Sequence, residues 1–277
     1  MVLALKLAFG AAVHVNRGNH EDVELSRAYD FERELQRKYG GDNAKELLRR
    51  AGRCFAAMPL ALVLRFTGEG RHSVGRDIAV LHGGIPRDLA PLSELASAPL
   101  VASVAAAHFD ADPDRGGAEP SDPRLVVQDV LWSDSDEWLD GVAPNERRGG
   151  AGSIIGDGVL ADWLRDQGLD ALVRSHEVAF NGAERTDLGG GAERWTVFSC
   201  SNYPNGEGLN KAAVLAIDDG GACRPRRWEV PDGGAKKSSA DLGDRARAML
   251  HRHRRAVSRQ PRDTGPPEAC ARAIGAA

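Results

Sequence analysis

Several features that would assign a chain to a special class are missing from this sequence. No run of about 18 apolar residues occurs, so no segment is expected to span a membrane as a helix. The net charge of −4 gives no general reason to expect nucleic-acid binding. The four cysteines form no C-x-x-C motif and no paired spacing, which is typical of free thiols in a reducing compartment: Cys54, Cys200, Cys223 and Cys270. We therefore expect a cytoplasmic or nuclear protein with no membrane or nucleic-acid partner.

The composition is that of an ordinary globular protein, with 42% hydrophobic and 27% charged residues among 277. This length suits one large domain with a tail, or two small domains. The composition changes after Pro231. Residues 240–257 could form a basic amphipathic helix, typical of a calmodulin target or regulatory segment, although a solvated tail fits better. We predict a domain over 1–230 and a flexible or partly helical basic tail over 231–277.

Residues 1–15 are apolar enough to suggest a signal peptide, but they lack a basic leader and Lys6 interrupts the apolar run. Leucines followed by Gly10 instead predict the end of a buried helix and its cap. Apolar spacing predicts further helices over 26–39, over 42–59 with Asp42-Asn43 as N-cap, over 100–107, and over 157–167 with Asp157 as cap. Apolar runs predict strands over 61–66, 78–81, 169–173, 195–199, 212–217 and 226–230. The predicted elements include runs of helices and runs of strands, which is typical of a mixed α/β (α+β) fold.

One short stretch, residues 13–22, combines a β-type run with a glycine turn that presents Asn19 and His20 side by side. Adjacent residues in such a turn point in different directions, so Asn19 can offer its oxygen to a metal while His20 faces a reacting group. An Asn oxygen is a hard, neutral ligand for a divalent ion. A His can give or take a proton near neutral pH.

Two other histidines follow predicted strands. His82 ends the 78–81 run and precedes Gly83-Gly84, which lets the backbone turn sharply. His176 lies just beyond the 169–173 run. A lone His at the end of a strand is more often structural than a ligand. Sites in layered α/β folds gather beyond the carboxyl ends of strands, however, so Asn19, His82 and His176 are candidates for a single site.

Six short sequence blocks resemble, in their residues and in their order along the chain, the signature blocks of the PPP-type serine/threonine protein phosphatases, members of the calcineurin-like metallophosphoesterases. The blocks are R-G-N-H-E-D at 17–22, H-G-G at 82–84, L-W-S-D at 131–134, N-E-R-R-G at 145–149, R-S-H at 174–176 and F-S-C-S-N-Y at 198–203. The resemblance implies a metallophosphoesterase β-sandwich flanked by helices over about residues 1–230. It also implies hydrolysis of phosphoserine and phosphothreonine by direct attack of a metal-activated water.

Residue roles follow from the same resemblance. It makes Asn19, His82 and His176 metal ligands, and it makes His20 the donor of a proton to the departing oxygen. An arginine of the fourth block binds phosphate; Arg148 is preferred to Arg147, while the alternative is that both are solvated loop charges. Tyr203 is expected at the rim of the phosphate site, or otherwise to serve packing alone. Asp134 is a candidate for the cleft or the surroundings of the metal.

The two opening blocks of the family, G-D-x-H-G and G-D-x-V-D-R-G, do not occur in the sequence. In the family they supply further ligands for a pair of divalent ions (Mn, Fe or Zn), an Asp that supports the catalytic His, and a second phosphate-binding Arg. We therefore expect an N-terminally truncated fold that retains the ligands of only one metal, binds it weakly and turns over poorly. The alternative to a phosphatase is a catalytically silent domain that binds phosphoprotein or a regulatory subunit.

Overall fold

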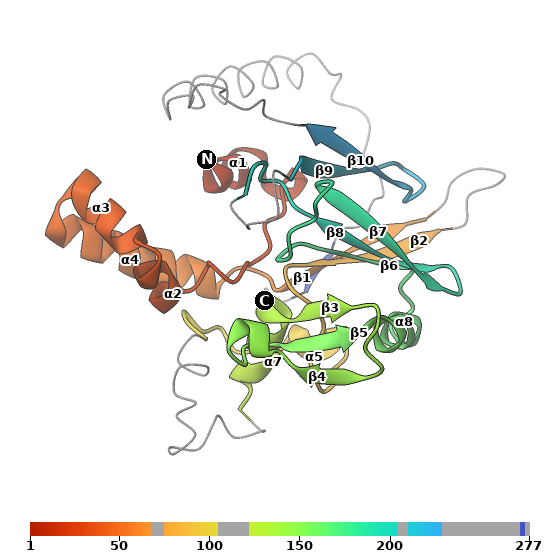
Figure 1. Cartoon of the computed structure of the whole chain (residues 1–277). Helices are drawn as coiled ribbons and strands as arrows, with labels where there is room; N and C mark the ends of the chain where they lie inside the picture. Colours follow the sequence, from red (N-terminus) through yellow and green to blue (C-terminus); the bar gives the residue numbers. More distant parts are fainter. Residues whose placement is uncertain (68–74, 105–121, 204–209, 229–271, 275–277) are drawn as a thin grey trace, which may run out of the picture.

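The computed structural model describes residues 1–67, 75–104, 122–203, 210–228 and 272–274. It has a large β-sheet with helices and a small sheet on one face and a two-stranded sheet on the other (Figure 1). This is the expected α/β sandwich flanked by helices. No helix in the described ranges is long and apolar enough to cross a bilayer.

The large sheet is six-stranded, in the order β11-β1-β2-β6-β8-β7. Its strands are β1 (Ala61–Phe66), β2 (Arg76–Leu81), β6 (Ala171–Arg174), β7 (Ala183–Gly189), β8 (Ala192–Val197) and β11 (Arg272–Ile274). β2, β6 and β8 are parallel neighbours, whereas β1, β7 and β11 pair antiparallel. The carboxyl ends of β2 and β6 therefore meet at one edge, which is the edge where an α/β fold places its site.

Alternation along these strands divides the core into two layers. Ala79 and Leu81 face one side with Leu172, and they pack against helices α5 (Leu92–Leu95), α7 (Arg124–Trp132) and α8 (Asp157–Asp166). Ile78 and Val173 face the other side, toward the two-stranded sheet of β9 (Ala212–Ile217) and β10 (Cys223–Trp228). A strand buried on both faces reads as a continuous apolar run, which is why the sequence revealed β6.

A small three-stranded sheet lies beside α7, in the order β3-β5-β4. Its strands are β3 (Asp134–Asp136), β4 (Val142–Pro144) and β5 (Ser153–Gly156), and the 3-10 turn η2 (Glu146–Arg148) joins β4 to β5. Asp134 opens β3, and only Ser133 separates it from the last residue of α7. This sheet was not predicted from the sequence because each strand is too short to show a period.

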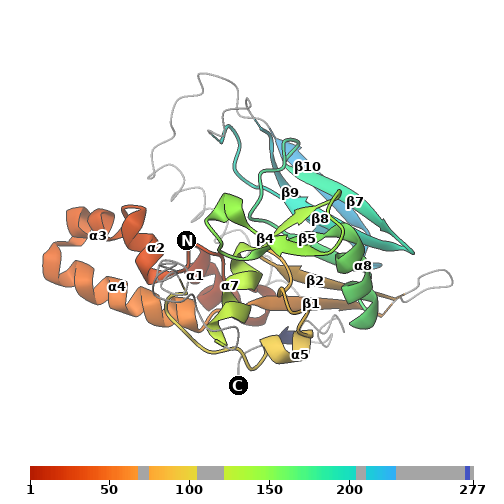
Figure 2. The same cartoon turned by 60° about the horizontal axis from the view of Figure 1, so that its bottom comes forward.

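The N-terminal third is mostly helical, with α1 (Val2–Phe9), η1 (Gly10–Ala12), α2 (Val23–Ala28), α3 (Phe31–Tyr39) and α4 (Gly41–Ala56). α3 and α4 form a hairpin that extends away from the sheets in both views (Figures 1 and 2). Leu35, Ala44 and Leu48 form its small core. The predicted helix α1 exists and ends at Gly10 with φ 48°, but none of its residues is buried, so its predicted burial was wrong.

Several predicted boundaries were wrong. The helix predicted over 26–39 breaks into α2 and α3 because Asp30 takes a left-handed φ of 67°. Asp42 and Asn43 lie inside α4 rather than capping it, since the helix already begins at Gly41. Asp157 is likewise the first residue of α8, whose N-cap is Gly156.

Two further local predictions also failed. Residues 13–15 are outside every strand of the described chain, although Val13 is extended. Residues 100–104 are not helical, because their backbone groups bond to the N-terminal segment instead; the rest of that predicted helix lies outside the described residues. The predicted helix over 240–257 also lies outside them, and the domain boundary at 230 stays a prediction.

Candidate active site

The turn that carries Asn19 and His20 is tied down by a buried arginine. Arg17 is 1% exposed, and its main-chain nitrogen donates to the Pro59 oxygen at 2.8 Å. Its guanidinium donates to the oxygens of Glu21, at 2.9 Å, and Val101, at 2.8 Å. The turn itself closes through a bond from the Glu21 nitrogen to the Gly18 oxygen at 3.1 Å. Asn19 is buried as a result, while His20 stays exposed.

Asp22 fixes the other end of this turn. It is the N-cap of α2, and its Oδ1 accepts from the main-chain nitrogens of Glu24, at 3.0 Å, and Leu25, at 3.1 Å. Its Oδ2 accepts from the Val104 nitrogen at 2.6 Å. A cap of this kind satisfies helix N–H groups that have no partner within the helix. One carboxylate thus joins the turn, α2 and a segment 82 residues away.

Parallel pairing of β2 and β6 brings the two histidines together. Val80 pairs with Val173, and the Ser175 nitrogen donates to the His82 oxygen at 2.9 Å just past the strands. His176 then takes a left-handed φ of 68°, which is uncommon for a residue with a side chain and persists only where the surroundings hold it. The side chain of His176 is 3% exposed.

The three predicted metal ligands converge. His82 Nε2 lies 2.9 Å from Asn19 Oδ1, and the rings of His82 and His176 are edge to face with centroids 5.1 Å apart. His176 Nε2 is buried without a hydrogen-bond partner. A buried, unpaired imidazole nitrogen is costly unless something binds it. Adjacent ligands of an octahedral ion with bonds of 2.0–2.1 Å lie about 3 Å apart, which fits the separation of Asn19 and His82.

Both imidazoles are neutral at physiological pH. Burial, followed by the positive charge of Arg174, lowers the pKa of His82 to about 4. Burial, followed by Arg148 and Arg174, lowers the pKa of His176 to about 3. A neutral imidazole keeps the lone pair that a metal needs.

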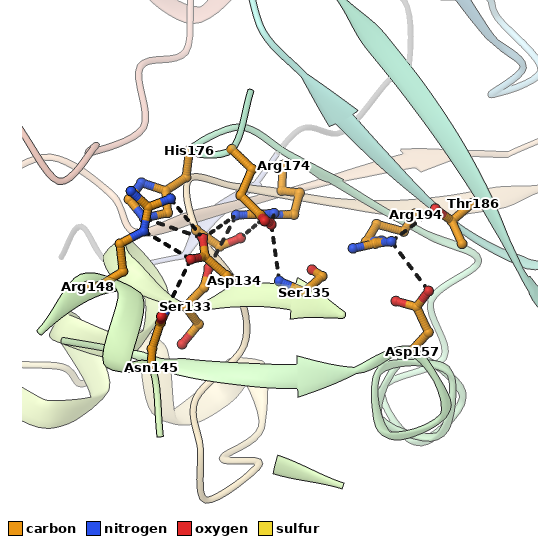
Figure 3. A network of polar contacts seen from close by, with 12 residues as sticks. Ser133, Asp134, Ser135, Asn145, Arg148, Asp157, Arg174, His176, Thr186 and Arg194 are labelled. Atoms are coloured by element: carbon orange, nitrogen blue, oxygen red, sulfur yellow. Dashed lines mark hydrogen bonds and ion pairs between the residues drawn. The ribbon is translucent and has the colours of Figure 1, made fainter. Parts of the chain in front are cut away.

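A carboxylate lies beside these rings. Asp134 Oδ1 is 3.7 Å from His176 Nε2, and Asp134 Oδ2 accepts from Arg148 Nε and from Asn145 Nδ2, both at 2.9 Å (Figure 3). Burial alone would raise the pKa of Asp134, but the hydrogen bonds from Arg148 and Asn145 outweigh it and lower that pKa. Arg148 is half-buried in this cluster while Arg147 is exposed. The geometry therefore favours Arg148, the arginine preferred from the sequence.

His20 and Tyr203 lie less deeply. The exposed His20 ring packs edge-on against Tyr29 with centroids 4.9 Å apart. Tyr203 is 45% exposed and packs on Phe198, with centroids 5.3 Å apart. In the part of the chain that the structure describes, no hydrogen bond or ring contact joins Tyr203 to the other candidate residues. Both interpretations of Tyr203, cleft or packing, stay open.

The sequence places Arg174, the last residue of β6, in the R-S-H block, but no role was predicted for this residue itself. Its guanidinium donates to the main-chain oxygens of Gly83 and of Ser133 and to the Glu177 carboxylate. Burial lowers the pKa of Arg174, and the charges of Glu177 and Asp134 oppose this effect. The signal was present, because a charged residue that ends a buried apolar run needs partners inside the protein.

Glycines allow the segments to approach one another. An alanine side chain at Gly18 would lie 2.7 Å from Glu21 Oε2 and 3.2 Å from His82 Nδ1. At Gly83 it would lie 2.8 Å from the Leu131 carbonyl carbon, and at Gly84 it would lie 2.8 Å from Ser133 Cβ. The H-G-G block thus exists because the backbone after His82 lies directly against the end of α7.

Among the described residues, no three His, Cys, Asp or Glu side chains form a group that could hold a metal. The candidate centre therefore consists of two imidazoles and one amide oxygen. These three donors suit a divalent transition ion, and the unpaired nitrogen of His176 fits the same interpretation. Because three neutral donors supply no negative charge to balance the ion, these residues fit a site that binds a metal weakly.

Comparisons with known proteins agree with the site. The family model for calcineurin-like phosphoesterases matches residues 2–180. The chain is 30% identical over 215 residues to a probable serine/threonine-protein phosphatase of Encephalitozoon cuniculi, covering 78% of this chain and 40% of that protein. It is 32% identical over 223 residues to the serine/threonine-protein phosphatase rdgC of Drosophila melanogaster, covering 79% of this chain and 30% of that protein.

A solved structure is also similar. It is a protein serine/threonine phosphatase from Saccharomyces cerevisiae, described as similar to human phosphatase PP5, with a TM-score of 0.57 and 25% identity. The match covers 85% of this chain and 66% of that chain. The chain spans only 40% of the length of the Encephalitozoon cuniculi relative and 30% of the length of rdgC.

Proposed function

This chain belongs to the calcineurin-like phosphoesterase family, and we propose that it forms part of the catalytic domain of a metal-dependent serine/threonine protein phosphatase. The family implies divalent metals. The names of the relatives support phosphoserine and phosphothreonine in proteins as substrates. The observation that carries the proposal is the buried, unpaired Nε2 of His176 beside His82 and Asn19.

In this proposal Asn19, His82 and His176 hold a divalent ion such as manganese, iron or zinc. When bound, such an ion supplies a Lewis acid and lowers the pKa of water, so that hydroxide forms near neutral pH. The contribution of the protein is to keep both imidazoles neutral and oriented. Burial does the first, and the hydrogen bonds of the surrounding loops do the second.

Arg148 is proposed to bind the phosphate. Its Nε and Nη2 donate to Asp134, at 2.9 and 3.2 Å, which holds the guanidinium plane beside the histidines. Its Nη1 has no hydrogen-bond partner among the residues that the structure describes. A phosphate oxygen can accept from that group without breaking the bond to Asp134. An arginine held in this way keeps its fork oriented, and an oriented donor stabilises charge that develops in the transition state.

His20 is proposed to donate a proton to the departing serine or threonine oxygen. It is adjacent to Asn19, yet it is exposed and therefore accessible to a protein substrate. Its neighbour in the chain, Asn19, places Oδ1 2.9 Å from His82 Nε2, so the turn that carries His20 lies against the candidate metal ligands. A rim position for Tyr203 is part of the proposal and rests on the F-S-C-S-N-Y block alone.

The alternative function is a silent phosphatase-like domain that binds phosphoprotein or a regulatory subunit. In the described part of the chain, no group of three or more His, Cys, Asp or Glu side chains could hold a metal, which favours this alternative. A cytoplasmic or nuclear location is proposed from cysteine usage, and Cys54, Cys200 and Cys223 are free thiols. Binding of a regulatory subunit or a calmodulin-like protein through residues 231–277 stays a prediction from composition.

The test measures phosphate release from a phosphothreonine peptide with added Mn²⁺. His176→Ala should abolish release, whereas the exposed His14, outside the site, provides a matched His14→Ala control that should leave it unchanged. Release untouched by His176→Ala would refute the assignment. No release from the unsubstituted chain, together with phosphopeptide binding that depends on Arg148, would favour the silent domain.

A further inference from the structure

Arg174 is a charged side chain with no exposed surface. Placing a guanidinium in a protein interior is costly unless its N–H groups are paired. Here each nitrogen is used. Nη2 donates to the Ser133 oxygen at 3.2 Å (Figure 3). Nε donates to the Gly83 oxygen, and Nη1 donates to the Glu177 carboxylate. All three nitrogens are engaged inside the protein and the side chain has no exposed surface, so Arg174 is not accessible to a ligand from solvent.

The three partners of Arg174 each adjoin a site residue. Gly83 follows His82, Ser133 precedes Asp134, and Glu177 follows His176. These residues come from the end of β2, the end of α7 and the end of β6. One guanidinium therefore joins three segments that are far apart in the sequence.

Glu177 extends this junction. Its Oε2 also accepts from the Ser135 nitrogen at 3.1 Å, and the Glu177 nitrogen donates to the Ser175 oxygen at 2.8 Å. Both contacts hold the turn in which His176 keeps its left-handed φ of 68°. A strained conformation of this kind relaxes when its surroundings loosen.

We propose that Arg174 is a positioning residue, which sets the spacing of His82, Asp134 and His176 by joining the backbone segments that carry them. The proposal rests on the proposed function in taking the two histidines as metal ligands. Groups that orient ligands from outside change metal affinity by about 10–100-fold when they are lost. Arg174 acts on three segments at once and belongs to this class.

Lysine cannot replace this arginine. A lysine keeps the positive charge but presents a point-like ammonium on a flexible stem, whereas the three partners of Arg174 match a rigid planar fork. Arg174→Lys therefore separates the role of geometry from the role of charge.

The matched control is Arg76→Lys. Arg76 lies in the large sheet too, at the opposite end of β2 from His82. It is also mostly buried, pairing with Glu193 and donating to the Gly221 oxygen at 3.2 Å. It contacts none of the site residues, so Arg76→Lys should disturb the sheet without moving the ligands.

The first measurement is amide hydrogen exchange by mass spectrometry on the metal-free full chain. For Arg174→Lys, peptides over 82–85, 133–135 and 175–178 should exchange about tenfold faster or more, while a peptide over 213–217 should not change. Arg76→Lys should leave the three site peptides unchanged. The second measurement is Mn²⁺ binding followed by electron paramagnetic resonance, where Arg174→Lys should weaken binding at least about tenfold and Arg76→Lys less than twofold.

The proposal would be overturned if Arg174→Lys left the exchange rates of the three site peptides within twofold of those in the unsubstituted chain. It would also be overturned if Arg76→Lys accelerated exchange at these peptides as much as Arg174→Lys does. If circular dichroism shows that Arg174→Lys is unfolded, Glu177→Gln replaces it. That variant keeps the shape but removes the carboxylate partner, and it should speed exchange at 133–135 and 175–178 first; unchanged exchange there would overturn the proposal. If the unsubstituted chain binds no Mn²⁺, the proposed function fails, while the exchange measurement still decides the role of Arg174.

Discussion

Replacing Gly83 by alanine should displace the segment that follows His82. Gly83 does not have a positive φ, so alanine suits its backbone and the effect comes from contact alone. The added methyl carbon would lie 2.8 Å from both the Leu131 carbonyl carbon and the Val130 oxygen. These are backbone atoms of α7, which cannot swing aside as the tip of a side chain can.

The expected magnitude follows from these contacts. Non-bonded carbon atoms are most favourable about 3.5–4.0 Å apart, so the two backbones must separate by about 1 Å. Overpacking of this kind costs about 1–3 kcal/mol. The same movement stretches the bond from the Gly83 nitrogen to the Val130 oxygen, now 2.8 Å, whose loss costs about 1 kcal/mol more. We expect the free energy of unfolding to fall by at least about 2 kcal/mol.

Urea unfolding of the metal-free chain, followed by circular dichroism, measures this change. The matched control is Gly158→Ala, in the first turn of α8, where an added methyl group meets no atom within 4 Å. Alanine favours a helix over glycine by up to about 1 kcal/mol, so this variant should be as stable as the unsubstituted chain or slightly more so. The reasoning is refuted if Gly83→Ala unfolds within about 0.5 kcal/mol of the Gly158→Ala control.

Three further predictions concern the site. Arg148→Lys should reduce phosphate release at least about tenfold, because lysine cannot keep the two bonds to Asp134 and also bind phosphate. Arg147→Lys, at an exposed position, should change release less than twofold. Equal effects of the two substitutions in the phosphopeptide assay would contradict the assignment of Arg148. Asp22→Ala should lower the free energy of unfolding by about 2 kcal/mol, because the carboxylate accepts from three main-chain amides, and a loss below about 0.5 kcal/mol in urea unfolding would count against that role. Because the folded-state pKa of His176 is lowered to about 3 from 6.5, the unfolded chain binds more protons between these values, so stability should be complete above about pH 6.5 and fall as the pH is lowered. Urea unfolding at several pH values in the presence of a chelator checks this, and a His176→Gln variant that keeps the full slope would show that another group causes it.

Local sequence patterns predicted the positions of helices and strands better than they predicted where each helix or strand begins and ends. The strands at 61–66 and 212–217 agree with β1 and β9, and α8 agrees with the predicted helix to within a residue. The break at Asp30 was missed because its left-handed φ depends on how α2 and α3 pack, not on a glycine that the sequence would display. Residues 100–104 were misjudged for a related reason, since their backbone pairs with groups about 80 residues away.

The candidate site shows the same division. Chemically specific side chains in short blocks singled out Asn19, His82, His176 and Arg148. The structure brings the first three together and joins Arg148 to them through Asp134. Tyr203 belongs to a block that resembles the family just as clearly, yet no contact among the described residues joins Tyr203 to these four residues. No role was predicted for Arg174, because its position at the end of an apolar run shows that it needs partners inside the protein but not which groups they are.

The sequence by itself determined which residues carry the chemistry and which segments can form strands and helices, because side-chain identity and local periodicity are properties of neighbours along the chain. Only the tertiary structure decided how far apart the reacting groups lie. The parallel pairing of β2 with β6 and the packing of the segment after His82 on α7 set those distances. Both interactions join residues that are about 50 to 90 positions apart. No local sequence pattern indicates which distant segments will pair, because hydrogen bonds and packing select the partners only when the whole sheet forms.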